Sequence, residues 1–130
     1  MKSYRKPGNL KFWRNVSNGM IITFLSTLMS LVGLSCIVFF SDFSISESIM
    51  YYLVMAIHCF SIFIGSLIVS YFVGEKGFWL GAAIGFIYSI IILLLGFGYV
   101  QEIFFYQAVL YKIILGIVAG AFGGIVGVNL

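Results

Sequence analysis

Long runs without a charged residue most constrain what this chain can fold into. Three of them, residues 15–41, 48–74 and 77–101, have 27, 27 and 25 residues, and a fourth covers the last 18 residues. A helix needs about 20 apolar residues to cross a bilayer, whereas barrel strands alternate over about ten. Only 8% of the residues are charged, against about 25% in soluble domains. The sequence therefore excludes a soluble domain and predicts an all-α polytopic membrane protein.

Polar segments between these runs divide the chain into four expected spans. The spans cover residues 19–40, 49–73, 78–100 and 106–128, and a basic juxtamembrane segment, residues 1–18, precedes this transmembrane domain of residues 19–130. The second and third spans are separated only by Gly74-Glu75-Lys76-Gly77, which favours a tight turn because glycine is flexible. We therefore predict four transmembrane helices in two antiparallel hairpins.

The basic residues predict the orientation of the spans, because cytoplasmic flanks keep Lys and Arg while translocated loops lack them. Lys76 lies in the middle turn, and five more basic residues precede the first span. These five are Lys2, Arg5, Lys6, Lys11 and Arg14. We expect a bacterial plasma membrane protein with both termini in the cytoplasm and this segment against anionic lipid. The segment is too short to favour nucleic acid as a partner.

Glycines recur every four residues in the last two spans, and residues four apart share one face of a helix. The third span has Gly77, Gly81 and Gly85, and the fourth has Gly116, Gly120 and Gly124 with a second pair, Gly123 and Gly127. A face without side chains lets another backbone approach closely. We predict helix packing there, within one chain or between copies. The alternative is a locally unwound segment at residues 120–127 that lines a polar path.

Four residues within the spans form a candidate intramembrane polar site: His58, Ser61, Tyr88 and Lys112. We expect a neutral His58 that hydrogen bonds to Ser61, Tyr88 or a backbone carbonyl. The alternative is a proton relay, which needs a second titratable group, and we expect none at the depth of His58. Lys112 either extends to the outer interface or faces the bundle as an anion or substrate contact.

The sequence favours neither a cofactor nor catalysis. One His and two Cys do not make a metal site, and no nucleophile, base and orienting group can be placed at one depth, so we predict that the protein is not an enzyme. Its size is also that of small multidrug exporters and fluoride channels. However, exporters of that kind need a glutamate in the first span, and this first span has none. Fluoride channels show a Gly-Gly-Phe-Thr-Thr-Phe-Ser-like segment, and none is present here.

Two glycine-rich segments, residues 74–85 and 116–130, carry a family resemblance; the second ends in Gly-Gly-Ile-Val-Gly-Val-Asn-Leu. The chain resembles the YrzE-like small four-helix membrane proteins of Gram-positive bacteria. The resemblance implies the four-span topology and the glycine faces, and it implies no catalytic residue.

Two functions agree with this pattern. We expect a structural or accessory role, in which the protein acts through glycine-mediated helix packing with itself or with a larger membrane complex. The alternative is a small oligomeric transporter or channel for a neutral or lipid-like substrate, because hydroxyls, tyrosines and glycine backbone are the polar lining available.

Overall fold

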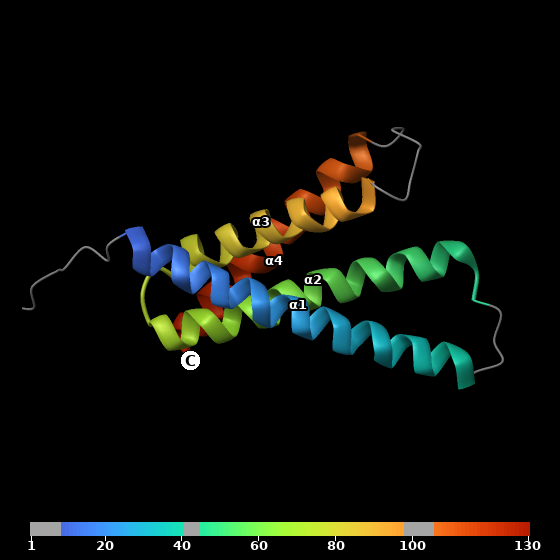
Figure 1. The fold of residues 1–130 in the computed structure, drawn as a ribbon, viewed down its shortest axis with the longest axis horizontal. Coiled ribbons are helices and arrows are strands. Elements are labelled where there is room, and N and C mark those ends of the chain that lie inside the picture. Colours follow the sequence, from blue (N-terminus) through green and yellow to red (C-terminus); the bar gives the residue numbers. More distant parts are fainter. Residues whose placement is uncertain (1–8, 41–44, 98–105) are drawn as a thin grey trace, which may run out of the picture.

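Four helices make up the fold in the computed structural model, which describes residues 9–40, 45–97 and 106–130 (Figure 1). They are α1 (Asn9–Phe40), α2 (Glu47–Val73), α3 (Gly77–Phe97) and α4 (Tyr106–Asn129). The described residues contain no strand, and all four helices are long and apolar enough to cross a membrane. The predicted fold class is confirmed: the protein is an all-helical, multi-pass membrane protein.

The helices differ from the expected spans mainly at the start of α1. This helix begins at Asn9, well before residue 19, because no proline interrupts residues 9–18 and Phe12 packs against the core. α2 ends at Gly74, which has a φ of 66° and donates its N–H to the carbonyl of Ser70 at 2.9 Å. That left-handed conformation is the usual role of glycine after a helix. The expected end of the third span, residue 100, lies outside the described residues.

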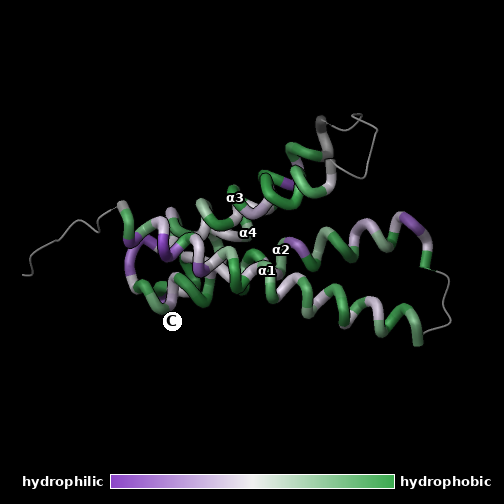
Figure 2. Tube along the Cα trace, in the orientation of Figure 1, coloured by the Kyte–Doolittle hydropathy of each residue, from purple (hydrophilic) through white to green (hydrophobic). Residues whose placement is uncertain are grey.

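The bundle has a closed end and an open end. The start of α1, the turn at residues 74–76 and the end of α4 lie together at the closed end, and the α1–α2 pair diverges from the α3–α4 pair toward the open end (Figure 1). Hydrophilic residues gather at the closed end (Figure 2). Of the basic residues, Lys11 and Arg14 are exposed there, while Lys2, Arg5 and Lys6 lie outside the described residues. The cytoplasmic location of this end stays a prediction.

α3 and α4 run antiparallel with their backbones in direct contact. A Cβ atom on Gly81 would overlap the carbonyl oxygen of Gly120, and a Cβ atom on Gly120 would overlap the carbonyl oxygen of Gly81. We call the three close pairs the glycine ladder: Gly77 with Gly124, Gly81 with Gly120, and Gly85 with Gly116. Such an approach allows Cα–H···O contacts. It also maximises the van der Waals contact that associates helices in lipid, where burial of apolar surface gives little gain.

α4 lies between α3 and α2, and a second glycine face contacts α2. Cβ atoms on Gly123 and Gly127 would overlap the carbonyl oxygens of Phe63 and Leu67. α4 is helical without interruption from Tyr106 to Asn129, so the unwound segment considered at residues 120–127 is not present. Within the described residues, α1 contacts α2 and α3 but not α4.

The core lies in the closed half of the bundle. Its hydrophobic cluster consists of Val16, Val69, Leu80 and Ile84. The buried residues of α1 all lie in its first half. Beyond Thr27 most of its side chains are exposed, including Val32 at 62% and Phe39 at 81%. A large apolar surface of α1 therefore faces outward.

We predict that Gly81→Ala and Gly120→Ala each destabilise the bundle by about 1–3 kcal/mol, the usual cost of overpacking. A single methyl group is enough because it meets backbone, which cannot change rotamer. The measurement is the free energy of reversible unfolding of the purified protein in detergent, monitored by circular dichroism.

Gly96→Ala is the matched control, since no atom of the described residues lies within 4 Å of a Cβ at this position of α3. It should be neutral or slightly stabilising, because alanine favours a helix over glycine. Equal stability of all three variants and the wild type would contradict the ladder.

Candidate functional site

A pocket lies between α2, α3 and α4 where the two helix pairs diverge. Its volume is about 80 Å³, and a single water needs about 10–15 Å³, so it can hold several waters or a small polar group. The lining residues are Tyr51, Val54, Met55 and His58 from α2, Ser89, Ile92 and Leu93 from α3, and Lys112 from α4. We call it the polar pocket.

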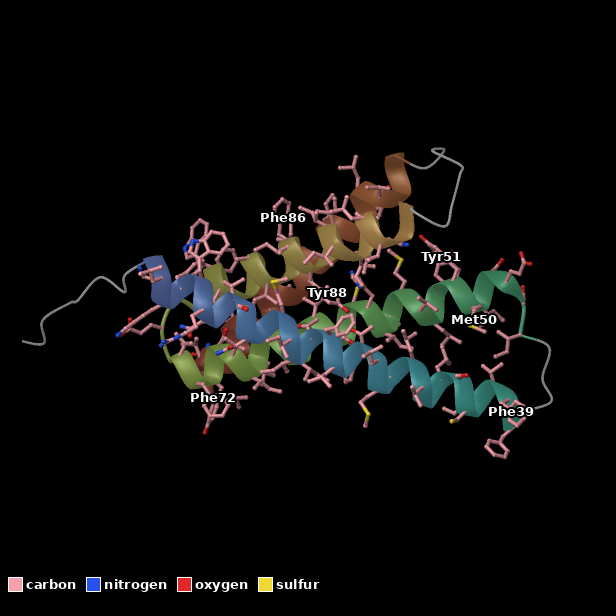
Figure 3. The ribbon with its side chains drawn as sticks, in the orientation of Figure 1. Phe39, Met50, Tyr51, Phe72, Phe86 and Tyr88 are labelled. Atoms are coloured by element: carbon pink, nitrogen blue, oxygen red, sulfur yellow. The ribbon has the colours of Figure 1, made fainter. Side chains whose placement is uncertain are left out.

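The polar side chains of this pocket come from three helices. The Nζ atom of Lys112 lies 5.8 Å from the centre of the Tyr51 ring, within the range of a cation–π interaction. The Nε2 atom of His58 lies 3.4 Å from the Oγ atom of Ser89. Tyr51 extends from α2 into the space between the helix pairs (Figure 3). The pocket thus presents an amine, an imidazole and two hydroxyl-bearing side chains, and no carboxylate of the described residues lines it.

A layer of ring stacking and hydrogen bonds connects the pocket to α1. The ring of His58 stacks on that of Tyr88, with 5.5 Å between centres and 24° between planes. The hydroxyl groups of Tyr88 and Thr27 are 2.6 Å apart, and Thr27 donates to the carbonyl of Thr23 at 2.8 Å. Tyr88 is therefore the donor to Thr27. Because Tyr88 is only 2% exposed, this bond ties α3 to α1 inside the bundle.

The structure brings together three of the four residues predicted as a polar site. His58 and Lys112 line the same pocket, and Tyr88 stacks on His58. Ser61 is fully buried outside the pocket lining, and its hydroxyl has no hydrogen-bond partner among the described residues. The expectation that no second titratable group accompanies His58 is wrong, because Lys112 shares its pocket.

Ser89 is the site residue that the sequence interpretation missed. It takes the place of Ser61 as the hydrogen-bond partner of His58, and it packs against Gly116 of α4. The signal was present, since Ser89 continues the four-residue spacing after Gly85 and so shares its face of α3.

Metal-ligating groups do not gather in this site. The described residues hold no group of three or more His, Cys, Asp or Glu that could bind a metal ion. Both cysteines are free, with Cys36 exposed and Cys59 half-buried. The donors that the pocket offers are suited to a ligand rich in hydrogen-bond acceptors.

Fold and site together define a small multi-pass membrane protein with four apolar helices and a polar pocket between three of them. Residues 13–127 match the family model described as "Protein of unknown function (DUF3792)". The chain belongs to this family, which is uncharacterised. No curated protein matches the chain, and no solved structure matches it.

We predict that the Tyr88–Thr27 hydrogen bond contributes about 0.6–1.7 kcal/mol, from the average to the maximum found for such bonds between membrane helices. The measurement is a double-mutant cycle with Tyr88→Phe and Thr27→Val, read as the free energy of unfolding in detergent. Tyr71→Phe is the control, because Tyr71 is 55% exposed and should tolerate loss of its hydroxyl group. A coupling energy near zero would show that the layer does not hold α1 to α3.

Proposed function

We propose that this protein has a structural or accessory role in the membrane and associates, with itself or with a larger complex, through the open half of α1. The carrying observation is that the buried residues of α1 all lie in its first half, while the second half presents a long apolar surface that is largely exposed among the described residues. The close glycine contacts also support this role: the ladder holds α3 to α4, and Gly123 and Gly127 hold α4 to α2, so these three helices form a fixed unit beside α1.

Gly33 supports the choice of this surface. It lies in the exposed half of α1, and nothing is within 4 Å of a Cβ placed there. Glycine in a transmembrane helix is typical of positions where another backbone packs. The glycines of α3 and α4 that form the ladder meet partners within the chain, whereas Gly33 meets none among the described residues. A helix from outside would supply that contact.

We also propose a cellular location and a family for this protein. The basic residues at the closed end favour a bacterial plasma membrane protein with that end in the cytoplasm. We also propose that the chain is one of the YrzE-like proteins of Gram-positive bacteria and that it does not catalyse a reaction.

A second candidate function is transport of a neutral or lipid-like substrate by an oligomer. The polar pocket favours it, because amphipathic side chains from three helices meet there next to apolar ones. In that case an oligomer would place several such pockets around a path through the membrane.

Pull-down of the tagged protein from its native membrane in mild detergent tests the association, with mass spectrometry for partners and stoichiometry. We expect one defined assembly, and we expect Gly33→Leu to weaken it about tenfold, which corresponds to about 1.4 kcal/mol of lost packing. The bundle itself should unfold as in the wild type, since the new side chain meets no atom of the fold.

Gly96→Leu is the control, because it adds the same side chain at an open position of α3. It should leave the assembly intact. A wild-type protein recovered as a lone monomer, or equal assembly of the Gly33→Leu variant, would refute association through α1.

A further inference from the structure

Lys112 is a cation without a counter-ion in the part of the chain that the structure describes. It lies in the second turn of α4, and its Nζ atom faces the ring of Tyr51 in the polar pocket. Of the described carboxylates, Glu47 and Glu75, neither forms an ion pair with it. An ionised side chain at membrane depth is unfavourable unless it is paired, and such residues mark functional sites. The amine therefore has the capacity to bind an anion.

The other polar groups of the pocket are arranged for the same ligand. The hydroxyl groups of Tyr51 and Ser89 and the imidazole of His58 line the pocket with Lys112, and all four can donate a hydrogen bond. A phosphate group carries several acceptor oxygens and a negative charge, and hydrogen bonds between ionised partners are the strong ones. A carboxylate in the lining would repel it, and none of the lining residues that the structure describes carries one.

The apolar part of the pocket lining favours a phosphate group that is part of a lipid. Val54, Met55, Ile92 and Leu93 complete the lining with apolar surface. Tyr51 and Val54 are about half exposed, at 45% and 44%, so the pocket communicates with the surroundings of the bundle, which are the bilayer. A phospholipid supplies a phosphate and apolar chains in one molecule, so one ligand would match both the polar and the apolar part of the lining.

We propose that the polar pocket binds the phosphate group of an anionic phospholipid, with Lys112 as its cation and with Tyr51, His58 and Ser89 as hydrogen-bond donors. The glycerol and the first methylenes of the acyl chains contact the apolar wall. This site goes beyond the accessory role and does not depend on association through α1, because no lining residue comes from that helix.

Native mass spectrometry of the purified full chain tests the site, with titration of phosphatidylglycerol and of a diacylglycerol that has the same acyl chains but no phosphate. We expect one phosphatidylglycerol to be retained per chain, and diacylglycerol to be retained at least about tenfold less, as expected for loss of a charge-assisted contact. Lys112→Gln should lower retention of phosphatidylglycerol to the diacylglycerol level, and Lys112→Arg should keep most of it.

Lys76→Gln is the matched control, because it removes one positive charge from the exposed turn between α2 and α3, which is part of neither the pocket lining nor the basic segment of residues 1–18, and should leave retention unchanged. Circular dichroism spectra of all variants separate loss of binding from loss of fold. If the glutamine variant unfolds, Lys112→Arg still tests the proposal, because loss of lipid retention in a folded arginine variant would contradict it. Equal retention by Lys112→Gln and wild type, or equal loss in Lys76→Gln, would overturn the proposal. Displacement of the lipid by millimolar inorganic phosphate would overturn the lipid assignment in favour of a free anion.

Discussion

The close approach of the α3 and α4 backbones along the glycine ladder is the constraint on which the rest of the structure depends. In lipid, a leucine gains little by moving from acyl chains to a helix interface, so association requires close contact between complementary surfaces. Five of the six ladder positions meet backbone first, and the sixth, Gly116, meets the Ser89 side chain first and the carbonyl of Gly85 next. A shift by one residue would press a side chain against that backbone, so the ladder fixes both register and distance. It also orients α4 so that Gly123 and Gly127 meet α2.

The divergence of the helix pairs and the polar pocket follow from the same distribution of side-chain size. Glycine and serine are concentrated in the closed half of α2, α3 and α4. Beyond Ser89, α3 presents Ile92 and Leu93 toward α2, and such side chains keep two helices apart. The space between them receives His58 and Lys112 from different helices. The site is therefore a geometric consequence of where close packing ends, and its chemistry comes from the few polar residues at that level.

The sequence predicted the four helices because charge-free length alone determines them, and helical geometry determines which glycines share a face. It did not predict which helix each face meets. The contact region of His58 and Lys112 depends on the relative depth of α2 and α4 in the bundle. The sequence pattern of residues 98–105 does not predict that depth. The early start at Asn9 was missed because a polar segment gives no hydropathy signal, although Phe12 packs on the core. Ser61 was placed in the site by its spacing from His58, but it turns into the core.

Solid-state NMR of the protein in lipid bilayers tests the central claim directly, with ¹³C introduced only at glycine so that no side chain is altered. The account predicts interhelical correlations between Cα and carbonyl carbons of Gly77 with Gly124, Gly81 with Gly120, and Gly85 with Gly116. Spectra with only sequential glycine correlations, or with pairs displaced along the helices, would contradict a bundle held together by this ladder.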